Sequence, residues 1–190
     1  MGVRVSRESI AALLAAPEEG WTPIEPPVSV GTGRSFVSGD PEGDRLRVRY
    51  FRRARDGALV GRVWFGPGAE GPPGHAHGGS MAAVLDEAMG AAAWMAGHTV
   101  VAARMTINFR SMLLLESDVL LEAWVDRVEG RKVITRSRLV DRAGGCCAEG
   151  EGLFVVLDAE RFGALADHAA ETFGKVLAPA AARRGSGDGQ

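Results

Sequence analysis

Residues 71–97, GPPGHAHGGSMAAVLDEAMGAAAWMAG, decide how this chain is organised. A turn rich in Pro and Gly leads into His77–Gly79, and a nearly uniform run of small and apolar residues follows, which predicts a buried helix over residues 78–97. Two acids, Asp86 and Glu87, interrupt this run. Burying a carboxylate costs several kcal/mol unless something compensates, so the two acids indicate a functional site in the helix.

The two glycines at the start of this helix are suited to binding an oxygen atom that carries negative charge. A missing side chain lets a ligand approach main-chain N–H groups that have no partner within the helix, and the positive end of the helix dipole points to the same place. The Gly78 N–H is therefore a candidate oxyanion hole for acyl transfer, where one such donor lowers the barrier by about 3 kcal/mol. The alternative is that the glycines only make a tight turn.

Length and composition favour one main domain with a sizeable core. The chain has 190 residues, 46% of them hydrophobic, and a net charge of −2, so neither nucleic acid nor a membrane is an expected partner. Cys146 and Cys147 are adjacent, and neighbours on a strand point to opposite faces, so we expect free thiols and a reducing compartment. The N-terminal residues lack the continuous apolar run of a secretion signal. We therefore expect cytoplasmic localisation.

Segments with the alternating pattern of strands surround the predicted helix. Ahead of it, residues 45–51 and 58–66 predict a hairpin. After it, four runs predict an antiparallel meander: 99–110, 119–128, 132–141 and 146–157. An edge strand is also expected around residues 35–38, and short helices are expected over 6–15 and 159–166.

These elements divide the chain into three parts. Residues 1–44 form an N-terminal helix and approach segment, residues 45–166 the main domain, and residues 167–190 a C-terminal extension whose small and polar composition indicates partial disorder. The main domain is predicted to be α+β, with an antiparallel sheet of five to six strands wrapped around one long central helix. This arrangement is the hotdog fold.

The sequence also resembles a known family. The stretch HGGSMAAVLDEAMG is similar to the motif of hotdog acyl-CoA thioesterases, in particular those of the phenylacetic-acid-degradation type. GPPGHAHGG, MTINFRS and DRVEGRKV are similar in order and spacing to the mitochondrial acyl-CoA thioesterase branch, so the resemblance covers residues 60–157. It implies an enzyme that hydrolyses acyl-CoA or carrier-bound acyl thioesters to a free acid and a thiol.

The resemblance assigns catalytic roles to named positions. The family's acid, nine positions after the His of His-Gly-Gly, falls on Asp86, which is implied to be the nucleophile or the general base. The amide that polarises the carbonyl falls on Gly78, with His77 beside it. For His77 the alternative is a turn residue that hydrogen-bonds across a dimer contact. Consecutive helical residues point about 100° apart, so Glu87 is either a back-up acid or a partner in a salt bridge.

Further positions are expected to bind substrate. They lie at the helix start, along an acyl tunnel, and at cationic sites for the nucleotide: Gly79, Met81, Met89, Arg110, Arg131 and Lys132. Core filling is the alternative for the two methionines, and a solvated hairpin tip is the alternative for the last two residues. Coenzyme A enters as part of the substrate, so no separate cofactor is expected. No metal is expected either, because no carboxylate or Cys stands at metal-ligand spacing from the loop histidines.

A sheet wrapped around one helix leaves unpaired edges, and a twofold dimer is the simplest way to cover them. The resemblance implies a homodimer or a dimer of dimers in which one subunit supplies the Gly amide and the other the acid. One position departs from the family: Ala102 stands where a Thr or Ser helps to hold the water. The alternatives are a non-catalytic acyl-CoA-binding protein, which Ala102 would suit, and a hydratase or dehydratase, which usually needs a His soon after the acid. No His follows Asp86 before His98.

Overall fold

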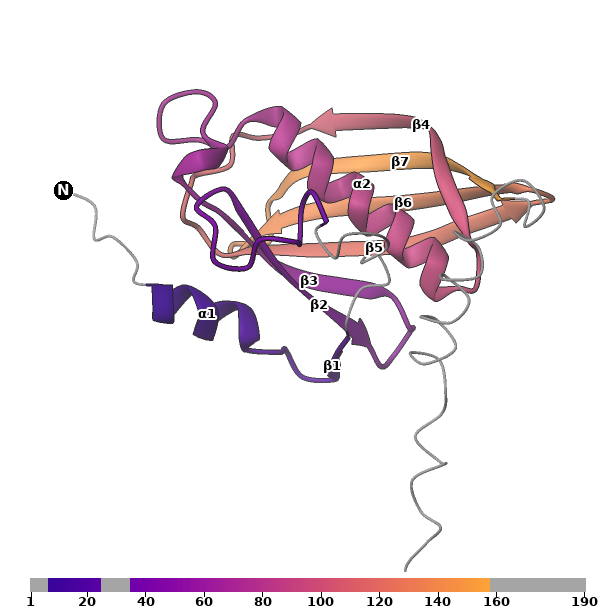
Figure 1. Ribbon diagram of the computed structural model, residues 1–190, viewed down its shortest axis with the longest axis horizontal. Coiled ribbons are helices and arrows are strands. Elements are labelled where there is room, and N and C mark those ends of the chain that lie inside the picture. The colour runs from indigo at the N-terminus through magenta and orange to yellow at the C-terminus, as the bar shows by residue number, and fades with distance from the viewer. Residues whose placement is uncertain (1–6, 25–34, 158–190) are drawn as a thin grey trace, which may run out of the picture.

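A computed structural model of the protein describes residues 7–24 and 35–157 (Figure 1). A long helix, α2 (Gly78–Met95), lies against one face of a single antiparallel sheet that curves around it. This is the predicted hotdog arrangement. The helix expected over 159–166 and the extension 167–190 lie outside the described residues.

The bounds of α2 follow from local chemistry. The side chain of His77 accepts a hydrogen bond from the Gly79 N–H and so caps the start of the helix. The many alanines favour the helical backbone, and Gly97, with a φ of 87°, stops it soon after Met95. Eight of its residues are buried, which confirms the predicted core helix: Met81, Val84, Leu85, Ala88, Met89, Ala91, Ala92 and Ala93.

Within the described residues the sheet has seven strands, in the order β1-β2-β3-β5-β6-β7-β4, where the sequence predicted five to six. The strands are β1 (Trp21–Pro23), β2 (Leu46–Arg53), β3 (Leu59–Phe65), β4 (Val100–Phe109), β5 (Val119–Glu129), β6 (Lys132–Asp141) and β7 (Cys146–Val156). The additional strand, β1, has three residues and pairs with the end of β2. A short 3₁₀ helix, η1 (Pro67–Ala69), follows β3.

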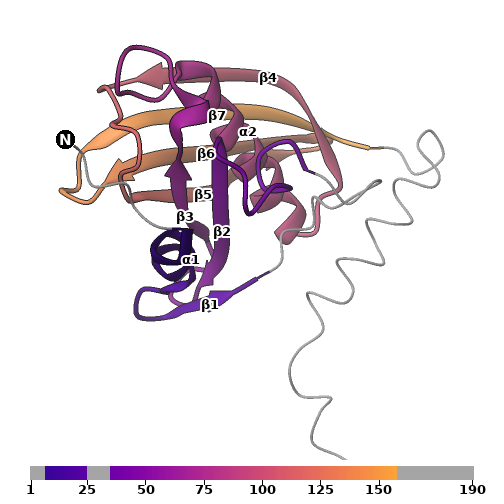
Figure 2. The same cartoon turned by 60° about the vertical axis from the view of Figure 1, so that its left-hand side comes forward.

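The first helix, α1 (Arg7–Ala15), confirms the element expected near the N-terminus. Its buried side chains Ile10 and Leu14 pack on Trp64 of β3 in a small cluster of their own. Trp64 belongs to the face of the sheet that points away from α2, and Figure 2 shows α1 on that side of β2 and β3. The sheet therefore has a helix on each face, and of the two α-helices in the described residues only α2 belongs to the main core.

Two predictions about the strands were wrong. Strands β5, β6 and β7 form a meander, but β4 does not continue it, because β4 pairs with β7 at the sheet's far edge. The chain leaves α2 at the edge beside β7, crosses to β5, and only then folds back strand by strand. Residues 35–38 form a turn and not an edge strand, with the Gly39 N–H donating to the Ser35 carbonyl at 3.0 Å. Glycine and proline just downstream favour that turn.

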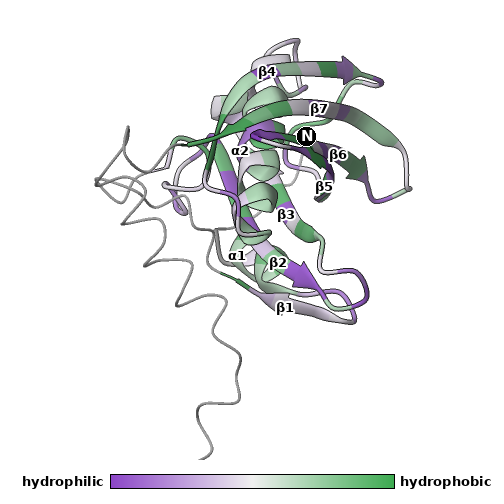
Figure 3. Cartoon of the chain, turned by 90° about the vertical axis from the view of Figure 1, so that its right-hand side faces the viewer, coloured by the Kyte–Doolittle hydropathy of each residue, from purple (hydrophilic) through white to green (hydrophobic). Residues whose placement is uncertain are grey.

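The edge strand β4 is unusually exposed for its composition. Apart from Val100 at its start, none of its residues is buried. Its apolar side chains Val101, Met105 and Phe109 are 44%, 37% and 53% exposed, and Figure 3 shows hydrophobic residues along this strand. An unpaired strand edge with exposed apolar side chains is a surface that another chain can cover.

Candidate active site

The start of α2 faces a small cavity at the end of β4. Its volume is about 340 Å³. The lining residues come from the loop before α2, from the first turn of α2, from the last residue of β4 and from the segment that follows it: Pro72, His75, Ala76, Gly78, Met81, Phe109, Arg110, Ser111 and Met112. Three of the predicted site residues, Gly78, Met81 and Arg110, therefore lie together.

Gly78 presents a free amide at this cavity. No acceptor for its N–H is found within residues 7–24 and 35–157. A Cβ atom at this position would lie 3.3 Å from the Phe109 ring, which is a tight contact, so the absence of a side chain allows the close approach of Phe109. An unpartnered N–H at a helix N-terminus is a suitable donor to a developing oxyanion.

His77 positions that amide. Its Nδ1 accepts a hydrogen bond of 2.9 Å from the Gly79 N–H, and its own N–H donates to the Ala69 carbonyl at 2.8 Å. Because Nδ1 is an acceptor, the neutral ring carries its proton on Nε2. Gly79 also has a steric role, since a Cβ there would lie 2.9 Å from the His77 ring. His77 and Gly79 thus hold the helix start in shape around Gly78.

Asp86 lies two turns further along α2 and is half-buried. Burial, followed by the charge of Glu87, raises the pKa of its carboxyl group above the ordinary value. No hydrogen-bond partner for this carboxylate occurs in the described part of the chain. The eight-residue separation from Gly78 corresponds to about 12 Å along the helix axis. One chain therefore does not bring the acid and the amide to the same carbonyl group.

Glu87 points in a different direction from Asp86 and is held by two hydroxyl groups. Tyr50 Oη of β2 donates to Glu87 Oε1 at 2.9 Å, and the Ser35 hydroxyl donates to Oε2. Tyr50 is fully buried. Burial, the charge of Glu87 and this hydrogen bond raise the pKa of the Tyr50 phenol well above its ordinary value. Sequence reasoning missed Tyr50 and Ser35, although Tyr50 occupies an inward position of a predicted strand.

The two methionines differ in their surroundings. Met81 is buried but lines the cavity beside Gly78. Met89 is completely buried against β7, where Cβ atoms at Gly150 and Gly152 would lie 3.3 Å and 3.1 Å from its side chain. These glycines make room for Met89 between helix and sheet. Met89 fills the core in this chain, in line with the alternative weighed for it.

The cationic residues are spread over both ends of β4. Arg110 is exposed beside the small cavity and pairs with Glu149, its Nε lying 3.0 Å from Oε1. Arg131 and Lys132 are exposed at the turn between β5 and β6, beside the start of β4, because the Val156 N–H donates to the Arg131 carbonyl. The ten residues of β4 span about 33 Å. Within one chain, Arg131 and Lys132 are therefore far from Gly78.

Ala102 lies on β4 opposite Phe154 of β7, next to an irregularity in the register between Ala102 and Arg104. It is exposed, as is Thr106 further along the same strand. Ala102 itself has no hydroxyl group, and Thr106 lies four residues further along the same strand. The position at which the chain departs from the family's pattern, Ala102, therefore lies on the exposed edge strand of the sheet.

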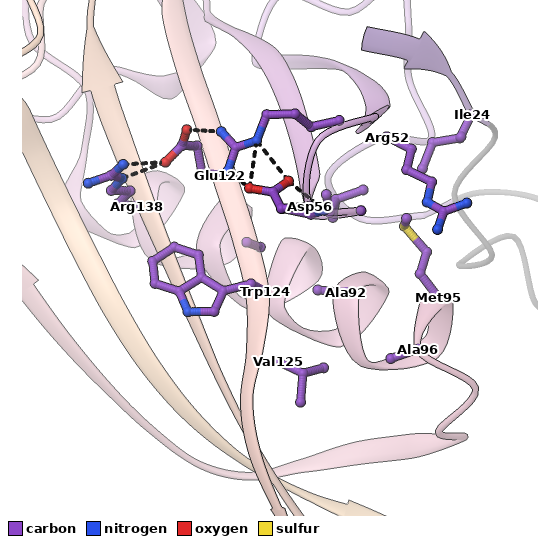
Figure 4. A pocket seen from close by; sticks show the side chains of 15 residues that line it. Ile24, Arg52, Asp56, Ala92, Met95, Ala96, Glu122, Trp124, Val125 and Arg138 are labelled. Carbon is purple, nitrogen blue, oxygen red and sulfur yellow. Dashed lines mark hydrogen bonds and ion pairs between the residues drawn. The ribbon is translucent and has the colours of Figure 1, made fainter. Parts of the chain in front are cut away.

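A second and larger cavity lies at the other end of α2. It measures about 740 Å³ and involves the last turn of the helix, the hairpin of β2 and β3, and β5 (Figure 4). Arg53 pairs with Asp56 and Glu122, and Glu122 also pairs with Arg138. None of the predicted site residues lines this cavity.

Other features bear on what the chain can hold. Both cysteines are free, as expected. Among the described residues there is no group of three or more side chains that could hold a metal ion. Within the same residues, none of the helices is both long and apolar enough to cross a membrane.

Comparisons with known proteins give one family. A family model described as the thioesterase superfamily matches residues 73–148. The acyl-coenzyme A thioesterase THEM4 of Bos taurus is 38% identical over 128 residues, which are 66% of this chain and 52% of that protein. THEM4 of Xenopus laevis is 31% identical over 115 residues, 60% and 52% of the two chains. The chain thus spans about half the length of these curated relatives.

A solved structure supports the same family. A protein described as a thioesterase superfamily protein is 29% identical, with a TM-score of 0.60 over 78% of this chain and 74% of that one. The matched model covers α2 and the strands that follow it, up to the first residues of β7. Sequence and fold agree: residues 73–148 match the thioesterase superfamily, and the chain has the hotdog fold.

Proposed function

We propose that this protein hydrolyses acyl-CoA thioesters, with the Gly78 N–H of one subunit binding the thioester oxygen and Asp86 of the other acting on the carbonyl carbon. The observation that carries the proposal is the free amide at the start of α2 together with a half-buried acid of raised pKa two turns away. The names of the THEM4 relatives indicate coenzyme A as the thiol.

A twofold dimer brings the two groups together. They are about 12 Å apart along one helix, so a second helix has to supply the partner. The exposed apolar edge of β4 offers the contact, and antiparallel pairing of two such strands places the start of one beside the end of the other. The same pairing brings the partner's Arg131 and Lys132 toward the cavity at Gly78, where cations would suit the phosphates of coenzyme A.

The chemistry then needs few groups. The Gly78 N–H donates to the carbonyl oxygen as it gains negative charge. Asp86 either takes a proton from a water molecule whose oxygen attacks the carbonyl carbon, or attacks that carbon itself to form an anhydride that water then cleaves. In both routes the C–S bond breaks, the thiol leaves and the free acid remains. The raised pKa of Asp86 supports the general-base route.

Thiol release from a panel of aromatic and medium-chain acyl-CoAs, with acyl-carrier thioesters as a second panel, tests the proposal. We expect turnover that Asp86→Asn removes and that Asp126→Asn, an equal change of charge at an exposed site on β5, leaves intact. Turnover by a stable monomer would contradict the shared site, so the oligomeric state is measured by sedimentation under the assay conditions. Dimer against tetramer, the acyl group and cytoplasmic localisation stay predictions.

Ala102 favours a second candidate function, a non-catalytic acyl-CoA-binding protein, because no hydroxyl group is present there to hold the water. In that case acyl-CoA raises the melting temperature without thiol release. The pair of readouts, thermal shift and thiol release on the same acyl-CoA, separates the two functions. A hydratase or dehydratase ranks below both, since α2 carries no His after Asp86.

A further inference from the structure

A buried polar cluster lies directly beside the proposed catalytic acid and has no role in the chemistry described so far. It consists of Tyr50, Glu87 and Ser35, and it joins three separate parts of the chain: β2, α2 and the turn before β2. Tyr50 is 1% exposed, and Glu87 is half-buried on a helix whose other buried residues are apolar. Polar side chains in such a position need a compensating arrangement.

Glu87 binds both of its neighbours through its own oxygens. Each carboxylate oxygen accepts one hydroxyl hydrogen, from Tyr50 on one side and from Ser35 on the other. Hydrogen bonds from hydroxyl donors favour the charged form of a carboxylate. No Lys, Arg or His in the described residues pairs with Glu87, so its negative charge is held in place without being neutralised.

The position of this charge connects it to Asp86. The two residues are consecutive on α2, which turns their side chains about 100° apart, so Glu87 cannot reach the same substrate carbonyl group from the same side. Its charge nevertheless acts on Asp86: after burial, it is the cause that raises the pKa of the Asp86 carboxyl group. A like charge nearby makes a carboxylate a stronger base.

We propose that Tyr50 and Ser35 fix the Glu87 carboxylate beside Asp86, and that Glu87 is a positioning residue whose negative charge makes Asp86 a better proton acceptor in thioester hydrolysis. This inference rests on the proposed function. It assigns different tasks to the two adjacent acids: Asp86 contacts the reacting atoms, and Glu87 acts through Asp86.

Few other titratable groups face this part of the helix. In the sheet register, the residues of β3, β4, β5 and β6 that point toward α2 are apolar, small or hydroxyl-bearing. β7 contributes the buried Cys147 thiol. β2 contributes Arg52 besides Tyr50, but Arg52 lines the far cavity near Met95 (Figure 4). His77 stands at the helix start, and the partner's His77 and Gly78 complete the surroundings of Asp86 in the proposed dimer.

Glu87→Gln tests the charge while keeping the shape. The amide oxygen still accepts a hydrogen bond, and a hydroxyl group can turn to accept one from the amide nitrogen, so the cluster and the fold survive. We expect the acidic limb of the profile of kcat/KM against pH to move to lower pH. In the separate profile of kcat against pH, we expect the plateau to fall about two- to tenfold, because a weaker base remains. KM stays unchanged, since Glu87 does not contact substrate.

Two further variants separate charge from packing. Tyr50→Phe leaves Glu87 with a single donor and should move the limb in the same direction by a smaller amount. Glu87→Asp keeps the charge on a shorter side chain and should restore part of the wild-type position of the limb. Asp126→Asn, the control for net charge, leaves the limb where it is. A merely structural cluster would lower the melting temperature in Glu87→Gln and Tyr50→Phe without moving the limb, and that result overturns the proposal.

A measurement that needs no turnover separates the role of Glu87 from the proposed function. Titration of ¹³C-labelled aspartate carboxyls by NMR, with the Asp86 signal assigned through Asp86→Asn, needs no turnover. We expect the Asp86 midpoint to fall in Glu87→Gln. An unchanged midpoint overturns the role of Glu87 even if the protein is a thioesterase, whereas a wild type without thiol release overturns the function by itself. Loss of turnover in Glu87→Gln as complete as in Asp86→Asn would make Glu87 the reacting acid and overturn the inference.

Discussion

A cavity lies at each end of α2, and the two cavities differ in volume and in whether their polar groups have partners. At the start of the helix the space is small, about 340 Å³, and it contains a main-chain N–H without an acceptor in the described residues. At the far end the space is about twice as large, but four of its charged side chains, Arg53, Asp56, Glu122 and Arg138, are paired with one another. Unmet hydrogen-bonding capacity, and not volume, distinguishes the end suited to acyl chemistry.

Two acids, Asp86 in the middle of α2 and Glu122 at the larger cavity, make the same contrast in terms of stability. Asp86 has no partner among the described residues and its pKa is raised, so its charged form is disfavoured in the folded protein. Glu122 has two arginine partners, and its pKa is lowered: burial raises it, but the hydrogen bonds and charges of Arg138 and Arg53 outweigh burial. An ionisable side chain whose burial destabilises the fold is a candidate for a functional role. One that stabilises the fold through ion pairs already has a structural role.

The largest expected effect is that of Asp86→Asn. We expect kcat to fall about 10³-fold, within the range for loss of a general base, while the melting temperature at pH 7 rises slightly, because a carboxylate disfavoured by burial is replaced by a neutral group. Thiol release and differential scanning calorimetry on the same preparation measure the two changes. If Asp86→Asn lowered the melting temperature as well as kcat, Asp86 would stabilise the fold as Glu122 does, and the contrast between the two acids would be wrong.

Gly78→Ala comes next and tests the other half of the site. The added Cβ would lie 3.3 Å from the Phe109 ring, so either the ring or the helix start has to shift away from the oxyanion position. We expect kcat to fall about 10²-fold, near the effect of losing one oxyanion donor, with the oligomeric state unchanged. The far end of α2 provides the control, because Ala96→Ser adds an atom to an exposed residue there. Equal activity of the two variants would show that the oxyanion position tolerates a side chain at residue 78, which contradicts the proposed close fit around the Gly78 amide.

The part of this site that the sequence predicts is local. The helix α2 follows from an uninterrupted run of small and apolar residues bounded by His77 and Gly97, and Gly78 and Asp86 are read from the same stretch. Strands β5, β6 and β7 follow from alternation and glycine-containing turns over neighbouring residues. All these features are set by contacts close in sequence, which a pattern can carry.

The parts that the sequence did not predict depend on distant contacts. The sequence of β4 alternates in the same way whether the strand pairs with β5 or with β7. Its place beside β7 therefore depends on contacts with a strand distant in sequence, which the pattern within β4 does not show. The contact of Tyr50 with Glu87 joins residues 37 positions apart. β1 has only three residues, one of them a proline, which is too short for a pattern to show. Arg131 and Lys132 lie far from Gly78 within one chain, so their proposed place beside it depends on a second chain and not on the pattern of this one.

Glu122→Gln is expected to have a smaller effect, and on stability alone. It removes the charge that holds Arg53 and Arg138, at a cost of about 1–2 kcal/mol in the free energy of unfolding for a partly buried pair, and kcat stays unchanged. Because the folded pKa of Glu122 is lowered, the stabilisation is present above its ordinary pKa and is lost as pH falls through the folded pKa. Urea unfolding at neutral and acidic pH should therefore show a difference between wild type and variant that shrinks on acidification. A difference independent of pH would assign the effect to packing.

The smallest expected effect is that of filling the larger cavity. Ala96→Leu places an apolar side chain at its edge, one turn beyond Ala92 and beside Met95. If the far end of α2 takes no part in the reaction, kcat and KM on the best acyl-CoA stay within about twofold of wild type, the usual range for a substitution away from the reacting groups. A rise in KM confined to the longest acyl chains would instead show that the acyl tail reaches this end of the helix. The comparison would then become one between two parts of a single substrate site, with the polar reaction at one end of α2 and the apolar tail at the other.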